Sequence, residues 1–167
     1  MTTVRNVAFI GDGGVGKTTY LERLIEGTFQ QRYVSTIGSR EYYITGNEMG
    51  DEGMLDTNCS FHITDTAGQE KYGGLGLNRI EADTYMLFFD LTSKISFKNC
   101  ATWINKVREH NANASIILVA TKADVIERKV KKSSINRFIN KWDIPVCIEI
   151  STKSCLNYDK PFVYLDI

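Results

Sequence analysis

Apolar runs alternate with segments of helical periodicity along almost the whole chain. Several of the apolar runs are nearly continuous, which is typical of strands in a parallel sheet that is covered on both faces. We interpret six runs as strands, at Val4–Ile10, Glu41–Thr45, Ser60–Thr64, Tyr85–Asp90, Ile116–Ala120 and Val146–Ile150. Helical patterns span Thr18–Glu26, Ser96–His110 and Lys132–Lys141, and a short one follows Asp159. The alternation predicts an α/β sandwich whose ligand-binding loops lie at the carboxyl ends of the strands.

The longest helical pattern carries one apolar stripe. Its members recur at helical spacing and are Phe97, Cys100, Trp103, Ile104 and Val107. We expect this stripe to face the core rather than a ligand. Ser96, at the start of the pattern, is a candidate N-cap of the helix.

Composition and charge narrow the class of protein. The 167 residues include 20 basic and 20 acidic side chains, so the net charge favours neither nucleic acid nor an anionic membrane as a partner. The four cysteines form no CxxC pair, which indicates free thiols in a reducing compartment. We find no membrane-spanning run, signal peptide or lipid-attachment motif. We therefore expect a soluble, intracellular, monomeric single domain over residues 1–167, with no membrane anchor and no direct contact with nucleic acid.

A glycine-rich loop joins the first predicted strand to the first predicted helix. It reads Gly11-Asp-Gly-Gly-Val-Gly-Lys17-Thr18, which is a complete GxxxxGKS/T phosphate loop. The glycines let backbone N–H groups approach phosphates, Lys17 adds a positive charge, and the Thr18 hydroxyl suits Mg²⁺. The N-terminus of the helix adds the positive end of its dipole. The loop predicts a nucleoside triphosphate site; a glycine-rich turn that binds nothing is the alternative.

Two further segments suit a magnesium ion and an attacking water molecule. Asp65-Thr-Ala-Gly-Gln-Glu70 follows the third predicted strand, so the Asp65 carboxylate can reach the Mg²⁺ shell and the Gly68 N–H can face a γ-phosphate. Gln69 carries an uncharged amide that can orient water. Thr36, in Tyr33-Val-Ser-Thr36, offers a second hydroxyl to Mg²⁺, although such a threonine is more often an ordinary loop residue.

Two segments after the fifth and sixth predicted strands suit a guanine base. A carboxylate at the end of Thr121-Lys-Ala-Asp124 can accept the N1–H and N2–H₂ of guanine, a pair of donors that adenine lacks. In Ser151-Thr-Lys153, the backbone N–H of Thr152 can donate to guanine O6. Each segment alone is common by chance. Their order, with each segment after a strand, favours guanine as the base.

These five segments resemble the five G elements of the Ras superfamily of small GTPases, over essentially the whole chain. Within that superfamily the chain is most similar to the Ran family. The segments that carry the likeness are Gly11-Asp-Gly-Gly, Tyr33–Gly38, Asp65–Leu75, Asp90-Leu-Thr-Ser, Phe97-Lys-Asn-Cys with Trp103, Glu127–Lys131 and Asn157–Phe162. The resemblance implies a P-loop NTPase three-layer α/β sandwich. Its six-stranded, mostly parallel sheet has one antiparallel edge strand and helices on both faces.

The resemblance also implies roles for the residues that match the family's motifs. The implied nucleotide-binding residues are Asp12, Gly13, Gly14, Val15, Gly16, Lys17, Thr18, Thr19, Phe29, Gln30, Tyr33, Thr36, Gly68, Thr121, Lys122, Asp124, Ser151, Thr152 and Lys153. Thr18 and Thr36 would bind Mg²⁺, with Asp65 in the outer shell through water. Phe29 would pack against the guanine, with a structural phenylalanine as the alternative. Gln69 would be the catalytic residue.

The implied activity is that of a molecular switch that hydrolyses GTP to GDP and phosphate. Partners would read the segments around residues 30–40 and 66–80. A GTPase-activating protein would raise a slow intrinsic rate, and an exchange factor would reload the protein. A Ran-like role adds importin- or exportin-type receptors, nucleocytoplasmic transport, and a location in nucleus and cytoplasm. The alternatives are a Rab-like trafficking GTPase and a GTP-binding interaction module that does not hydrolyse.

The chain departs from the Ran pattern at several positions. Thr121 replaces the usual asparagine of the guanine motif, which implies weaker support for the phosphate loop, and Thr152 replaces the usual alanine. Thr64 stands in place of a tryptophan, and the acidic tip at Gly46–Thr57 is longer. Ran's C-terminal extension and acidic tail are not present in the sequence. The basic run Arg128–Lys132 is either a solvated face or a partner-binding patch.

Overall fold

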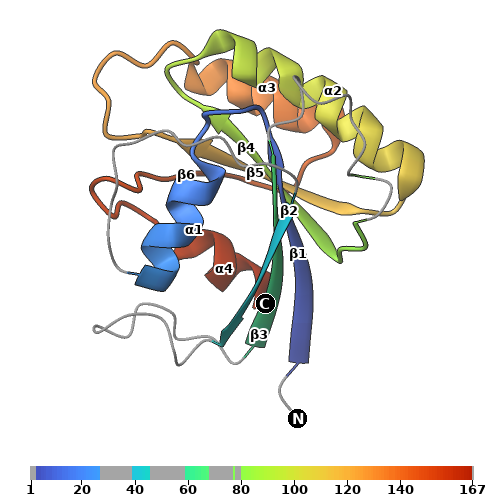
Figure 1. Cartoon of the computed structure of the whole chain (residues 1–167). Coiled ribbons are helices and arrows are strands. Elements are labelled where there is room, and N and C mark those ends of the chain that lie inside the picture. The colour runs from blue at the N-terminus through green and yellow to red at the C-terminus, as the bar shows by residue number, and fades with distance from the viewer. Residues whose placement is uncertain (1–2, 27–38, 46–58, 68–76, 78–79, 167) are drawn as a thin grey trace.

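The computed structural model describes residues 3–26, 39–45, 59–67, 77 and 80–166 (Figure 1). Within these residues, six strands form one sheet in the order β2-β3-β1-β4-β5-β6. The strands are β1 (Thr3–Gly11), β2 (Ser39–Thr45), β3 (Cys59–Thr66), β4 (Thr84–Asp90), β5 (Ser115–Thr121) and β6 (Cys147–Glu149). β2 pairs antiparallel with β3 at one edge, and all other neighbours are parallel. The predicted sheet type is therefore confirmed.

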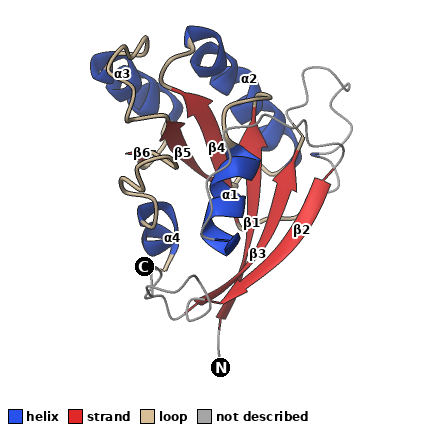
Figure 2. Ribbon diagram, turned by 60° about the vertical axis from the view of Figure 1, so that its left-hand side comes forward, coloured by secondary structure: helices blue, strands red, loops and turns tan. Residues whose placement is uncertain are grey.

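Helices cover both faces of the sheet (Figure 2). α1 (Lys17–Glu26) and α4 (Lys160–Leu165) pack on one face, and α2 (Lys94–His110) and α3 (Lys132–Trp142) pack on the other. The first face has an aromatic core in which Tyr20 and Phe162 pack against Phe9. The second face has a core around Trp103 and Ile104. This arrangement is the three-layer sandwich that the sequence predicts.

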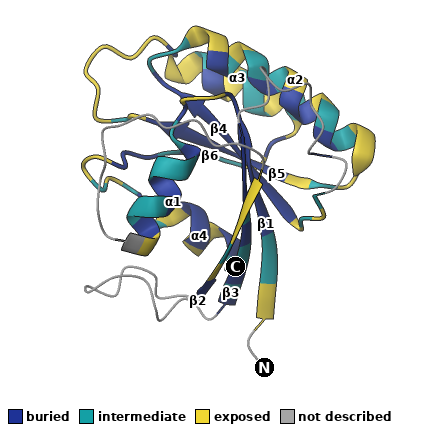
Figure 3. Cartoon of the chain, viewed as in Figure 1, coloured by how far each residue is buried: buried dark blue, intermediate teal, exposed yellow. Residues whose placement is uncertain are grey.

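The central strands are apolar on both faces because both faces are covered. Every residue of β4 is buried, as are the last six residues of β5 (Figure 3). The edge strand β2 instead exposes Ser39, Arg40, Glu41 and Tyr43, the last of which is 75% exposed. Continuous apolar runs thus mark the middle of the sheet, and a mostly exposed strand marks its edge.

Parallel pairing brings the carboxyl ends of the central strands to one edge of the sheet. Phe9 pairs with Asp65, Gly11 with Phe88, and Asp90 with Thr121. The carboxyl ends of β1, β3, β4 and β5 therefore lie next to one another. In an open α/β sheet this edge is where ligands bind.

The prediction that Ser96 caps the long helix is wrong. α2 begins two residues earlier, and Ser93 is its N-cap, with its hydroxyl accepting from the Ser96 N–H at 3.3 Å. Ser96 is buried in the first turn, where its hydroxyl donates to the Ser93 carbonyl at 2.9 Å and accepts from the Asp90 N–H at 3.0 Å. Ser96 thus ties α2 to the end of β4. The apolar stripe is confirmed as core, with Phe97 only partly buried.

The state of the cysteines and the length of the helices can be compared with the sequence predictions of free thiols and of no membrane-spanning run. All four cysteines are free, as predicted. Burial raises the pKa of Cys147 to about 12, so this group stays a neutral thiol near pH 7. In the described part of the chain, no helix has both the length and the apolar character that crossing a bilayer requires.

Tyr20→Phe tests the packing of α1 behind the loop. The fully buried Tyr20 hydroxyl donates to the Tyr158 carbonyl, and burial raises its pKa well above the ordinary range, so it stays protonated. Losing this donor should lower the free energy of unfolding by about 1–3 kcal/mol. Tyr164→Phe, at a partly exposed position on α4, is the matched control and should change it by less than about 0.5 kcal/mol. Urea unfolding followed by circular dichroism measures both, and equal stabilities would contradict the expectation.

Candidate functional site

The glycine loop between β1 and α1 lies at the carboxyl edge of the sheet, as predicted. Gly11, Gly14 and Gly16 have φ values of 131°, 75° and 99°, which side chains rarely allow. A Cβ on Gly11 would also lie only 2.3 Å from the Phe88 carbonyl oxygen. Glycine is therefore required where the loop leaves β1, because the neighbouring strand passes against it.

Lys17 is the first residue of α1, and its ammonium group turns back over the loop. The side chain is buried, and Nζ donates to the carbonyl oxygens of Gly11 at 2.7 Å and Asp12 at 2.8 Å. Those two carbonyls hold a positive charge at the N-terminal end of a helix. Both features favour an anionic ligand at this place.

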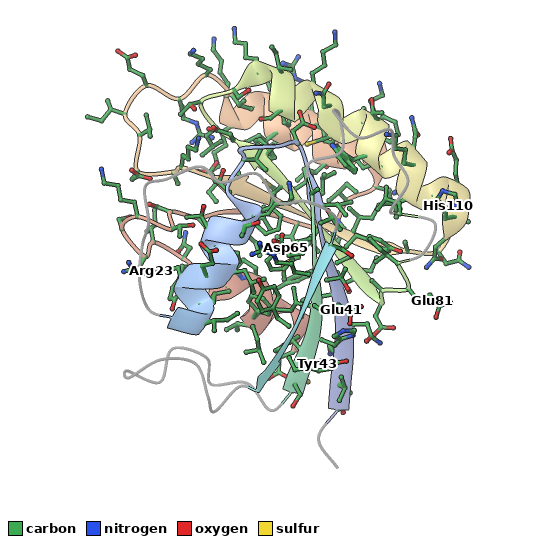
Figure 4. The ribbon with its side chains drawn as sticks, viewed as in Figure 1. Arg23, Glu41, Tyr43, Asp65, Glu81 and His110 are labelled. Atoms are coloured by element: carbon green, nitrogen blue, oxygen red, sulfur yellow. The ribbon has the colours of Figure 1, made fainter. Side chains whose placement is uncertain are left out.

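Asp65 provides a buried carboxylate beside the same helix end. Its Oδ2 accepts a hydrogen bond from the Thr18 hydroxyl at 2.6 Å, and its Oδ1 has no hydrogen-bond partner among the described residues. Burial raises the pKa of Asp65, while the bond from Thr18 and the charge of Lys17 lower it in part. Figure 4 shows Asp65 in the interior, close to α1. A buried carboxylate oxygen next to a hydroxyl fits a hard divalent cation such as Mg²⁺.

The loops after β5 and β6 form a second part of the site. The Thr121 hydroxyl lies 2.7 Å from the Val15 carbonyl oxygen and 3.1 Å from that of Phe89, so this residue joins β5 to the glycine loop. Asp124 is exposed, and its Oδ1 accepts a hydrogen bond from the Ser151 hydroxyl at 2.7 Å. The Ser151 hydroxyl also accepts from the Ser154 N–H at 3.0 Å. Ser151 therefore fixes one oxygen of Asp124 and leaves the other available.

Lys122 forms a contact that the sequence analysis missed. Its ammonium lies 2.5 Å from Asp90 Oδ2, at the carboxyl end of β4. The other oxygen of Asp90 accepts from the N–H and hydroxyl of Thr92, both at 2.7 Å. The sequence could have indicated this contact, because Asp90 ends a predicted strand whose carboxyl end lies at the same edge of the sheet as that of β5. The sequence analysis also missed that the Asp12 carboxylate contacts α2.

The described part of the predicted site gathers at one edge of the sheet. It comprises residues 12–19, Asp65, Thr121, Lys122, Asp124, Ser151, Thr152 and Lys153. The remaining predicted site residues are Phe29, Gln30, Tyr33, Thr36, Gly68 and the catalytic candidate Gln69, and they lie outside the described residues. The longer acidic tip at residues 46–57 lies outside them as well.

A comparison with protein-family models identifies the chain. The model of the Ras family matches residues 6–166, which include the glycine loop and both loops of the second part of the site. The chain belongs to the Ras family. A Ras-family protein is a small GTP-binding switch with GTPase chemistry, and the mostly parallel sheet with its phosphate loop is consistent with the family's P-loop NTPase fold. Family membership also implies guanine nucleotide binding and regulators of the usual kinds.

Proposed function

We propose that this Ras-family protein is a Ran-like switch that hydrolyses GTP slowly and depends on an activating protein for speed. The observation that carries the proposal is the meeting of Lys17, Thr18 and Asp65 beside the glycine loop. These groups supply a cation for phosphates and oxygen ligands for a metal ion at one point. Asp124 stands at the same edge of the sheet with one oxygen available for a base.

Phosphate binding in this proposal uses the backbone of residues 12–19 and the Lys17 ammonium. Thr18 and Thr36 would provide hydroxyl ligands for Mg²⁺, and Asp65 would act on the ion's outer shell through water. Asp65 Oδ1 supports this assignment, because it has no hydrogen-bond partner in the described part of the chain and a bound ion shell would supply the missing interaction. When bound, Mg²⁺ neutralises charge on the β- and γ-phosphates.

Guanine selection in this proposal rests on Asp124. Its two carboxylate oxygens, one of them bound to the Ser151 hydroxyl, would accept from N1–H and N2–H₂, and the Thr152 N–H would donate to O6. Lys122 and Lys153 belong to the same two loops, and Phe29 would pack on the ring. Thr121 links this part of the site to the phosphate loop through the Val15 carbonyl.

Asp124→Asn tests the choice of base. An amide cannot accept two hydrogen bonds from guanine with both of its heavy atoms, so affinity for GTP should fall on the order of a hundredfold. Xanthosine triphosphate, whose ring offers an acceptor where guanine has an amino group, should bind better than GTP. Asp143→Asn, at the exposed end of α3, is the matched control. Titration calorimetry in magnesium buffer measures the affinity of the wild type and of both variants for each nucleotide, and unchanged GTP affinity in Asp124→Asn would discredit the assigned role.

Hydrolysis in this proposal depends on Gln69, which orients the attacking water. Thr36 and Gly68 hold the segments around residues 30–40 and 66–80 only while Mg²⁺ and the γ-phosphate are present. Loss of the γ-phosphate removes those contacts and lets the segments relax. Partners then distinguish two shapes of the same surface, so the result of each turnover is a change in binding partner.

Gln69→Leu separates a hydrolysing switch from a GTP-binding module that never turns over. A leucine side chain cannot orient water, so GTP turnover should fall at least about tenfold while GTP affinity stays the same. Asn140→Leu, on the exposed side of α3, is the control and should keep the wild-type rate. Single-turnover phosphate release measures the rate. Identical rates in wild type and Gln69→Leu would support the binding module instead.

The Ran-like role rests on the segments that the sequence shares with that family and on the basic run 128–132. In this role the protein is a monomer found in the nucleus and the cytoplasm, and it exchanges between importin- or exportin-type receptors. The exposed side chain of Lys129 is available to such a partner, whereas the Arg128 guanidinium donates to both carboxylate oxygens of Glu149, at 3.2 and 2.8 Å.

A pull-down with two nucleotide states tests the transport role. Gln69→Leu protein loaded with GTP should retain importin-type receptors, and wild-type protein loaded with GDP should not, because only the first keeps the γ-phosphate. Immunoblotting of the retained fraction with receptor antibodies measures the difference. Receptors bound by neither state would favour a Rab-like trafficking GTPase.

A further inference from the structure

The phosphate loop contains a buried acidic side chain, Asp12, close to where a triphosphate would bind. Asp12 lies between Gly11 and the phosphate-binding backbone, and only 6% of it is exposed. A carboxylate that pointed at a triphosphate would repel it strongly, because few water molecules screen a buried charge. The direction in which Asp12 is held therefore bears directly on nucleotide affinity.

Two side chains of α2 hold the Asp12 carboxylate. Trp103 Nε1 donates to Oδ1 at 2.8 Å, and Asn99 Nδ2 donates to Oδ2 at 2.7 Å. The two donors are four residues apart and so lie on the same face of the helix. Both oxygens of the carboxylate are occupied by donors from outside the loop.

The rest of α2 makes this attachment rigid. Trp103 is itself 4% exposed, and Cys100 and Ile104 beside it are fully buried in the core. Ser93 caps the helix, and Ser96 ties its first turn to β4. The donors are therefore fixed by the body of the protein before any ligand arrives.

The backbone of Asp12 contacts the group that meets the phosphates. Its carbonyl accepts from Lys17 Nζ at 2.8 Å, next to the equivalent bond to Gly11. The residues that follow include Gly14 and Gly16, whose positive φ values give the loop little conformational preference of its own. Asp12 thus links two parts of the protein, because its carboxylate is bound to α2 and its carbonyl is bound to the Lys17 ammonium.

We propose that Asn99 and Trp103 are positioning residues of the phosphate loop, acting through Asp12. They turn its carboxylate away from the phosphates and fix the carbonyl that holds Lys17. Loss of either donor frees the carboxylate to rotate toward the ligand and loosens the ammonium. The inference rests on the proposed nucleotide site and adds α2 as the element that sets how long a nucleotide stays bound.

The test measures release of a fluorescent GDP analogue in magnesium buffer from Trp103→Phe and Asn99→Ala. Trp103→Phe keeps an aromatic ring in the core but removes the N–H together with part of the indole volume, and Asn99→Ala changes a partly exposed position. Each should speed release at least about fivefold, because a hydrogen bond to a carboxylate is lost. Trp142→Phe, the other tryptophan, packs on Phe138 in α3 and should stay within about twofold of wild type.

A double-mutant cycle identifies the route through Asp12. If Trp103 acts through this carboxylate, Trp103→Phe should add nothing to the release rate once Asp12→Ala is present. Additive effects of the two substitutions on the release rate would overturn the inference. Faster unfolding in urea with an unchanged release rate would also overturn it, because that is the result expected of a purely structural role. Asn99→Ala supplies the same cycle if Trp103→Phe fails to fold. Failure of wild-type protein to bind GDP would refute the proposed function itself, whereas normal binding with unaltered variants would refute only this inference.

Discussion

The shape of the phosphate loop depends on hydrogen bonds that its carbonyl groups accept from outside it. Lys17 occupies the carbonyls of Gly11 and Asp12, and the Thr121 hydroxyl reaches that of Val15. Because a peptide unit is planar, fixing a C=O in one direction fixes the next N–H in the opposite direction. The donors that a phosphate would use are thereby oriented by contacts on the other side of the loop. Glycine permits this conformation, and the carbonyl contacts select it.

A separate set of contacts explains how the site carries three buried carboxylates and still suits a polyanion. Asp90 is neutralised by Lys122, and Asp12 is turned toward two neutral donors on α2. Asp65 keeps one oxygen without a hydrogen-bond partner among the described residues, in the place where a divalent cation fits. The net charge of the whole chain is zero, so it gives no indication of how these carboxylates are arranged. Asp90 is thus paired with a cation, Asp12 is held by neutral donors and Asp65 is left for a metal ion, while the phosphates would meet the Lys17 ammonium and the helix end.

The sequence was sufficient for the sheet, the layers and the phosphate loop, because these follow from periodicity and from a motif of fixed spacing. Prediction from the sequence failed for side chains whose contacts depend on residues distant in the chain. Ser93 and Ser96 are both plausible caps by spacing, and only the packing of α2 against β4 makes Ser96 part of the core. The pairs Asp12–Trp103 and Asp90–Lys122 join residues 91 and 32 positions apart. No local pattern encodes such contacts, although the shared strand edge makes the second one foreseeable.

Thr121 shows how one substitution alters the link between the two parts of the site. A hydroxyl carries a single hydrogen, so it donates to the Val15 carbonyl at 2.7 Å or to the Phe89 carbonyl at 3.1 Å, but not to both together. The asparagine usual at this position in the resembling family has two N–H hydrogens and can serve two acceptors at once. The shorter distance favours Val15, which keeps the phosphate loop tied to β5. The tie nevertheless competes with the Phe89 carbonyl, so in this chain the phosphate loop and β4 compete for one hydrogen where an amide would provide two.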